Sequence, residues 1–346
     1  MSTAETEITR EEARDRGKIL VGRIIDRPKR FPKPTGLDVY KPRETDIVVS
    51  TFPKSGTTLT QQLTYQVVIA TGGAGARDPD GLTFDDICEV APLVDFGPDL
   101  GFIDYESNPR VFKSHVTPTL FHDTIQKHIV VIRNPTAYPA SCLDFQFEAW
   151  CGEKEPVTNK MILEEVYHQF LAIRILGLGD GLGFPFDNDD VGHKNEGDEK
   201  KDDKLPVGAW FLHAKGWLEG MRSNTLFMFY EDIVKDLAGT ARRVAAFMDR
   251  EISEEGVKQV VERCDRTYMS NDPKFKCTLE NKALGFGENA WKAKPKTRNG
   301  FKQFSPAPEE LEQINMRFKQ EFGVDSYEEF KEIVYRKQKE FGFCKN

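Results

Sequence analysis

The residues best suited to chemistry lie in one short segment, Thr51–Thr58, with the sequence TFPKSGTT. It carries, in order, Lys54, Ser55, Gly56, Thr57 and Thr58. A loop of this kind between a strand and a helix directs N–H groups and hydroxyls at one spot, where the helix dipole adds partial positive charge. Gly56 allows close approach of the backbone, and Lys54 can neutralise charge on a leaving oxygen. The segment indicates a phosphate site, with a simple strand-to-helix turn and a Ser/Thr cap as the alternative.

Two further polar groups end apolar stretches. His115 closes RVFKSH (110–115), two positions after Lys113, and Arg133 closes HIVVIR (128–133). An imidazole is tuned to take a proton near neutral pH, and a guanidinium fork matches phosphate oxygens. Taken alone, a histidine at a strand end is more often a surface or core residue than a base. A Walker A loop is excluded, because no GxxxxGK followed by Ser or Thr occurs.

The elements that must position these groups are apolar stretches separated by helical segments. Strands are predicted over residues 46–51, 110–115, 128–133 and 225–230. Apolar residues at helical spacing then predict a helix from position 57 to the glycines at 72 and 73. Continuous apolar strands that alternate with helices predict an α/β fold, with a central parallel sheet flanked by helices and ligands at the carboxyl ends of the strands.

Composition excludes several classes of protein. The chain has 346 residues and a net charge of −8, which disfavours a nucleic-acid binder. Its polar start is no secretory signal, and no apolar run reaches bilayer length, so we expect a cytoplasmic protein without a membrane partner. Six cysteines without a CxxC pair suit reduced thiols, and the six histidines form no HExxH or paired motif. We therefore predict no metal site.

The segment at Thr51 resembles the first signature of the cytosolic sulfotransferases, close to TYPKSGTTW, with Phe52 in place of the tyrosine. These enzymes use 3'-phosphoadenosine 5'-phosphosulfate (PAPS) as the sulfuryl donor. The resemblance implies a three-layer, P-loop-like fold with about five strands. It also implies that the segment holds the 5'-phosphosulfate, with Lys54 at the bridging oxygen. Leu59 stands where the family has a tryptophan that stacks on adenine.

The later signatures imply roles for further residues. The triplet Lys113-Ser114-His115 resembles the family's Lys-Thr/Ser-His, which makes His115 the general base and Lys113 a cation for the sulfuryl oxygens. RNPTAYPAS (133–141) resembles the segment that grips the 3'-phosphate. The donor-binding residues that the resemblance implies there and further on are Arg133, Ser141, Tyr230 at the adenine, and Arg298, Asn299 and Gly300 over the 3'-phosphate.

The predicted organisation is an N-terminal extension at 1–35 and a sulfotransferase domain at 36–346, with a mobile acidic insertion at about 177–204. The predicted activity is sulfuryl transfer from PAPS to a hydroxyl of a small-molecule acceptor, with an amine left open. Aromatic residues in the segments expected to wall the pocket favour an alcohol, phenol or sterol. The alternatives are a kinase-like phosphotransferase and a non-catalytic nucleotide-binding module. The resemblance is compatible with a homodimer.

Overall fold

The computed structural model describes residues 8–26, 36–73, 82–95, 108–121, 125–151, 157–178, 209–277, 279 and 300–342. Contacts between Cα atoms divide the chain into two compact units. The sheet unit comprises Pro32–Asn134, Gly216–Lys292 and Glu328–Asn346. The helical unit comprises Met1–Phe31, Pro135–Lys215 and Ala293–Tyr327.

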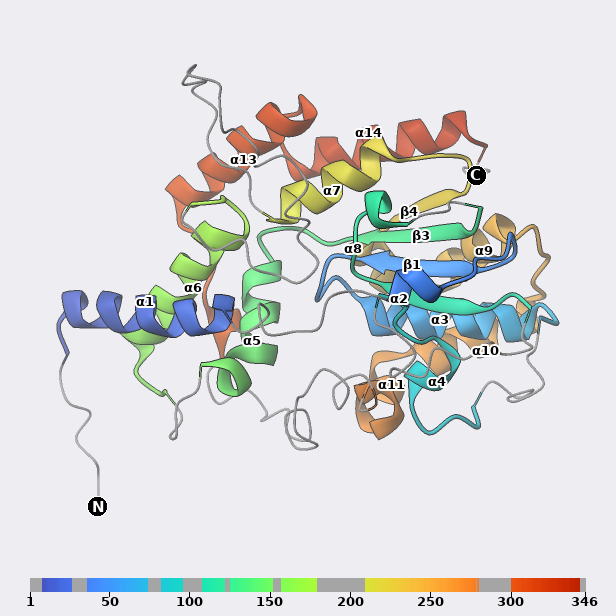
Figure 1. The fold of residues 1–346 in the computed structure, drawn as a ribbon, viewed down its shortest axis with the longest axis horizontal. Helices are drawn as coiled ribbons and strands as arrows, with labels where there is room; N and C mark the ends of the chain where they lie inside the picture. Colours follow the sequence, from blue (N-terminus) through green and yellow to red (C-terminus); the bar gives the residue numbers. More distant parts are fainter. Residues whose placement is uncertain are drawn as a thin grey trace. The chain divides into compact units, whose positions relative to one another are not determined.

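Four parallel strands form the centre of the sheet unit (Figure 1). They are β1 (Ile47–Thr51), β2 (Val111–Ser114), β3 (Lys127–Ile132) and β4 (Thr225–Phe229), in the order β2-β1-β3-β4. The ends of each strand lie within one residue of the ends of a predicted strand, which confirms the prediction of an α/β fold. The resemblance implied about five strands, whereas the described residues form four. Beyond β2, an isolated parallel bridge pairs Leu93 with Lys113.

Helices cover both faces of this sheet. The helices of the sheet unit are α2 (Gly36–Val39), α3 (Thr57–Ala70), α4 (Ile87–Val90), η3 (Pro118–Leu120), α8 (Tyr230–Lys235), α9 (Leu237–Phe247), α10 (Glu254–Cys264), α11 (Arg266–Asn271), η4 (Pro273–Lys276) and most of α14 (Tyr327–Glu340). Because side chains alternate along a strand, Val49 and Met228 face a core shared with α3, α9 and α10. Phe229 instead contacts Phe330 and Tyr335 of α14. Helix, sheet and helix thus form three layers (Figure 1).

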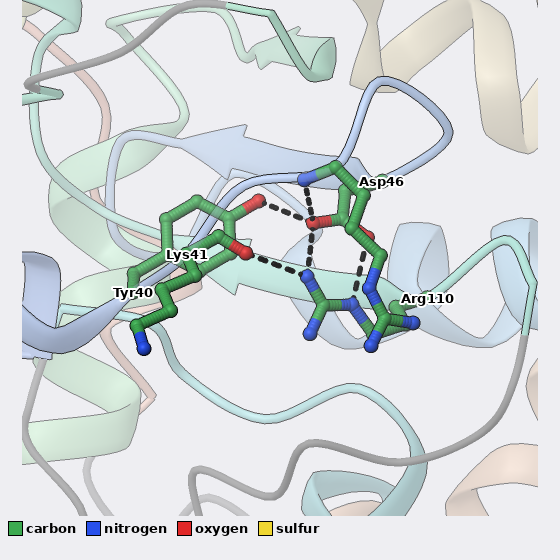
Figure 2. Close-up of polar contacts among 5 residues, drawn as sticks. Tyr40, Lys41, Asp46 and Arg110 are labelled. Atoms are coloured by element: carbon green, nitrogen blue, oxygen red, sulfur yellow. Dashed lines mark hydrogen bonds and ion pairs between the residues drawn. The ribbon is translucent and has the colours of Figure 1, made fainter.

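A buried ion pair joins the amino ends of β1 and β2 (Figure 2). The Asp46 carboxylate is fully buried and accepts hydrogen bonds from Arg110 Nε at 2.8 Å and Arg110 Nη2 at 2.6 Å. It also accepts from Tyr40 Oη at 2.9 Å and Arg43 N at 2.8 Å, while Arg110 Nη2 donates to Lys41 O at 2.9 Å. With both charges paired and hydrogen-bonded, this cluster fixes the edge of the sheet opposite the carboxyl ends of its strands.

The helical unit contains α1 (Arg10–Asp26), α5 (Tyr138–Trp150), α6 (Lys160–Arg174), η5 (Phe301–Gln303), α13 (Pro308–Phe322) and the first part of α7 (Ala209–Glu219). α1 packs closely on α6, since a Cβ at Gly17 would lie only 2.9 Å from Glu165 Cβ. Residues 10–26 of the predicted N-terminal extension therefore form a helix packed within this unit. The predicted acidic insertion lies outside the described residues except for positions 177 and 178. Among the helices that the structure describes, none is long and apolar enough to cross a membrane.

Candidate active site

The loop between β1 and α3, residues 52–56, has the geometry of an anion site. Lys54 and Gly56 both adopt left-handed conformations, with φ of 65° and 96°. That region costs residues other than glycine about 1–2 kcal/mol, so the surrounding structure must hold the lysine there. Ser55 is fully buried, and within the described residues its Oγ has no hydrogen-bond partner. Gly56 provides no side-chain cap for α3, so this hydroxyl and the first N–H groups of α3 are donors suited to phosphate oxygens.

Arg133 and Tyr230 pack against this β1–α3 loop. A Cβ at position 56 would come within 2.8 Å of Tyr230 Cε2, so glycine is needed to leave room for the ring. The Arg133 guanidinium lies 4.7 Å from the centroid of the Tyr230 ring. Its Nη1 donates to Lys54 O at 2.9 Å. Residues that follow β1, β3 and β4 therefore meet at the carboxyl edge of the sheet.

His115 follows β2 and is oriented by the last residue of β1. Its Nδ1 lies 2.9 Å from Thr51 O and 3.3 Å from Thr51 Oγ1. Because a carbonyl oxygen only accepts, Nδ1 carries the proton, and the neutral ring has its basic lone pair on Nε2. Thr51 Oγ1 also lies 2.6 Å from Thr57 Oγ1 in the first turn of α3. One threonine thus connects the imidazole with the start of the helix behind the β1–α3 loop.

Asp95 fixes the backbone that carries this imidazole. The carboxylate is fully buried, and its two oxygens accept from Ser114 Oγ at 2.6 Å and from His115 N at 2.7 Å. Ser114 Oγ in turn accepts from Val116 N at 3.2 Å. The Lys-Ser-His triplet is therefore held at the point where the chain leaves β2.

Lys113 is buried inside the sheet unit, with 3% of its surface exposed. Its Nζ donates to Cys277 Sγ at 3.5 Å and to Cys88 Sγ at 3.9 Å. No sequence motif indicates these two contacts with thiols. The predicted role of Lys113 at the sulfuryl oxygens stays a prediction.

In the helical unit, Ser141 and Gly300 lie on segments joined by a hydrogen bond. Ser141 is half-buried in α5, and Asp144 follows it by about one turn. Asp144 Oδ1 accepts from Phe301 N at 2.9 Å, directly after Gly300, whose φ is 53°. The other two predicted residues of this segment, Arg298 and Asn299, lie outside the described residues.

Comparison with known proteins assigns the family. The profile of the sulfotransferase domain matches residues 44–341, from just before β1 to the end of α14. The chain belongs to the sulfotransferase family. The match confirms the family that the TFPKSGTT segment, the triplet at 113–115 and RNPTAYPAS indicate.

Individual sulfotransferases are distant relatives of the chain. Sulfotransferase 4A1 of Mus musculus is 26% identical over 228 residues, covering 64% of this chain and 66% of that protein. Human sulfotransferase 1E1 is 24% identical over 252 residues, covering 68% of this chain and 70% of that protein. The amine sulfotransferase of Oryctolagus cuniculus is 27% identical over 242 residues, covering 68% and 67%. The chain thus spans slightly less than two thirds of the length of the mouse protein.

Solved sulfotransferase structures share the fold. Mouse sulfotransferase SULT7A1 complexed with PAP matches with a TM-score of 0.51 and 17% identity over 88% of this chain and 89% of that one. Retinol dehydratase in complex with androsterone and the inactive cofactor PAP matches with a TM-score of 0.52 and 18% identity over 88% and 93%. At such identities the likeness is one of fold, and it agrees with the predicted P-loop-like architecture.

The sulfotransferase residues predicted from sequence fall into two groups. The sheet unit holds Lys54, Ser55, Gly56, Thr57, Thr58, Lys113, His115, Arg133 and Tyr230, and the helical unit holds Ser141 and Gly300. Sequence reasoning assigned no role to Thr51, although it begins the first signature. It also missed Asp95 and Asp144, which stand in no motif. Only their contacts show that they position the triplet and residue 301.

Proposed function

We propose that this sulfotransferase moves a sulfuryl group from PAPS to a hydroxyl or amine of a small-molecule acceptor. The observation that carries the proposal is the pair of contacts made by Thr51. Its carbonyl orients His115 with Nε2 as the basic nitrogen, and its hydroxyl bonds the first turn of α3 behind the β1–α3 loop. A base and an anion site at adjacent strand ends are the arrangement that direct transfer to a hydroxyl requires.

Two neighbours in fold support PAPS as the donor, because they were solved with PAP, the nucleotide left when PAPS gives up its sulfuryl group. The buried Ser55 hydroxyl and the uncapped start of α3 fit a phosphate group. We assign the 5'-phosphosulfate to Ser55, Gly56, Thr57 and Thr58. Arg133, Ser141, Arg298, Asn299 and Gly300 are assigned to the 3'-phosphate, and Tyr230 to the adenine.

In the proposed transfer, the acceptor oxygen forms a bond to sulfur while the bond from sulfur to the bridging phosphate oxygen breaks. His115 Nε2 accepts the proton that the acceptor hydroxyl loses. Lys54 stabilises the negative charge that develops on the departing phosphate oxygen, and Lys113 stabilises the sulfuryl oxygens. Asp95 and Thr51 hold the imidazole and its tautomer during this step.

The proposed acceptor is an alcohol, phenol or sterol, with an amine as a second class. Androsterone in the complex of retinol dehydratase supports a sterol, and the rabbit amine sulfotransferase supports an amine by its name. We place the enzyme in the cytoplasm, with residues 36–346 as its sulfotransferase domain. A homodimer is the proposed assembly to test by size-exclusion chromatography with light scattering.

The activity is tested with purified protein, labelled PAPS and a panel of phenols, sterols, amines and sugars. His115→Ala should lower turnover about 10²- to 10⁴-fold while PAP still binds. The matched control is His168→Ala, because His168 is part of an ion pair with Glu310 in the helical unit. If no acceptor works and PAP does not bind, the proposal fails. PAP binding without turnover on any acceptor would instead indicate a binding module.

A further inference from the structure

Three side chains with metal-ligating atoms converge at one place in the sheet unit. Asp86, Cys88 and Cys277 each offer one ligand atom, and these atoms all lie within 4.8 Å of one another. Cys88 lies in α4, and Cys277 directly follows η4. The cysteines are far apart in the sequence, so the absence of a CxxC motif led to the prediction of no metal site. Folding creates a cluster that the spacing of the residues conceals.

Asp86 connects the two segments that carry the thiols. One carboxylate oxygen accepts from Cys88 N at 2.8 Å, and the other accepts from Leu279 N at 3.2 Å. The rings of Phe84 and Phe275 make an edge-to-face contact beside these segments, with centroids 6.1 Å apart. Each carboxylate oxygen has a second lone-pair direction, so these hydrogen bonds still allow coordination of a cation. The backbone therefore orients the carboxylate and both thiols before any ion binds.

The environment of the cluster is buried and strained. Asp86 is 5% exposed, Cys88 4% and Cys277 9%. Cys277 adopts a left-handed conformation with φ of 50°, which residues other than glycine adopt rarely and mainly where the surroundings impose it. Both sulfur atoms are thus directed inward at a defined position.

Lys113 shows that the two thiols face the same space. Its ammonium donates to Cys277 Sγ at 3.5 Å and to Cys88 Sγ at 3.9 Å. A divalent cation bound by both sulfur atoms would lie close to this positive charge, and the two would repel strongly in a buried site. The ammonium must therefore leave the sulfur atoms when a cation binds.

Geometry favours a cation over a disulfide at this pair. A disulfide needs sulfur atoms about 2.05 Å apart and makes no use of Asp86. Two thiolates bound to tetrahedral Zn²⁺ at about 2.3 Å each lie about 3.8 Å apart. The ligand atoms of Asp86, Cys88 and Cys277 lie within 4.8 Å of one another, which is compatible with this spacing. We propose that Asp86, Cys88 and Cys277 form a binding site for Zn²⁺, and that Zn²⁺ displaces the Lys113 ammonium. Water completes the tetrahedron, and both thiols release their protons on binding. The site shares Lys113 with the proposed transfer, but the proposal of metal binding does not require that activity.

The test is a titration of the reduced, metal-free full-length protein with Co²⁺, which serves as a coloured substitute for Zn²⁺. We expect thiolate-to-cobalt absorption, its loss when Zn²⁺ is added, and proton release in weak buffer. Cys88→Ser and Cys277→Ser should each abolish the absorption. Cys264→Ser is the matched control, because Cys264 is a buried thiol of the same unit and should leave the titration unchanged.

Substitution of Lys113 should strengthen metal binding, whereas the serine variants should abolish it. Lys113→Met keeps the length of the side chain and removes its charge, so the metal should bind at least about tenfold tighter. Lys127→Met, which removes a lysine of the same sheet that pairs with Asp249, should leave the affinity unchanged. Circular dichroism and Tm verify that each variant folds. Absence of the absorption in the wild type, or its persistence in both serine variants, would overturn the site. A Cys88–Cys277 disulfide found by peptide mapping, without metal binding, would also overturn it and make the pair a redox site.

Discussion

Gly56 is where the β1–α3 loop becomes α3, and replacing it with alanine tests the loop geometry directly. Its backbone has φ of 96° and ψ of 22°, in the left-handed region. The added Cβ would lie within 2.8 Å of Tyr230 Cε2. Gly56→Ala therefore combines a backbone penalty with a steric conflict, and the two can be separated.

The backbone penalty of a left-handed alanine is about 1–2 kcal/mol. Overpacking against the Tyr230 ring adds about 1–3 kcal/mol, so the free energy of unfolding should fall by about 2–5 kcal/mol. Gly72→Ala isolates the first contribution, because Gly72 has φ of 74° and a Cβ added there would meet no atom of the described residues within 4 Å. That control should cost about 1–2 kcal/mol.

Urea unfolding at equal m values measures these costs, and calorimetry measures binding of PAP. Gly56→Ala should also weaken the binding of PAP, since displacement of the Tyr230 ring and of the loop moves the buried Ser55 hydroxyl away from its position. In a Tyr230→Ala background, the cost of Gly56→Ala should drop to that of Gly72→Ala, which a double-mutant cycle reveals. Equal costs of Gly56→Ala and Gly72→Ala in the wild-type background would refute the contact between Tyr230 and the loop.

Three further predictions concern buried polar groups. Asp95→Asn replaces one of two accepting oxygens with a donor, so the side chain can no longer accept from both Ser114 Oγ and His115 N. The kcat should therefore fall up to about 100-fold with no change in the Kd of PAP. Arg110→Ala leaves the Asp46 carboxylate buried without its cation and should cost about 3–5 kcal/mol in urea unfolding. Burial lowers the pKa of His128 to about 3 from 6.5, so between these values the unfolded chain binds a proton that the folded chain does not. Stability should fall by up to about 1.4 kcal/mol per pH unit as pH decreases through that window, and His128→Gln should flatten the slope.

Matched variants give the results for Arg110 and His128 a reference. Arg242→Ala breaks an exposed ion pair with Glu254 and should cost less than about 1 kcal/mol, so an equal cost for Arg110→Ala would contradict a buried pair. The hydrogen bond with Glu310 raises the pKa of His168. The bond between protonated His168 and Glu310 therefore stabilises the folded protein below pH 6.5, and this stabilisation is lost as pH rises through the raised pKa. The pH dependence of stability due to His168 is thus opposite in sign to that due to His128. His168→Gln should leave the slope that His128 causes intact.

The sequence was sufficient for those parts of the site that are local in the chain. The segment from position 47 to 70 reads as strand, loop and helix because its apolar run, its break at Phe52-Pro53 and its later helical spacing are all adjacent. His115 and Arg133 were predicted as site residues for the same reason, since each directly follows an apolar strand, and their roles stay predictions. Composition could not supply the number of strands, for which the family analogy implied about five and the described residues contain four.

Contacts between distant segments could not be predicted in this way. Asp95 stands in no motif, and its importance depends on an isolated bridge that brings its segment beside β2. Gly56 was expected to let a ligand approach the backbone closely. In the structure, the missing Cβ also leaves room for the ring of Tyr230. Cys88 and Cys277 looked incidental because only tertiary packing brings them together around Lys113.

The strand order explains why the local signatures converge. With the order β2-β1-β3-β4, the chain passes from β1 to β2 on one side and then back across to β3 on the other. Such a change of direction opens a crevice at the carboxyl ends of the strands, where parallel α/β sheets bind their ligands. Thr51 ends the strand at that switch point, so its carbonyl can reach His115 after β2 while its hydroxyl reaches α3. Arg133, after β3 on the opposite side, then bonds the loop carbonyl of Lys54. The proposed base and the proposed anion loop are thus coupled through one central strand, so a change in its last residue, Thr51, should disturb proton transfer and nucleotide binding together.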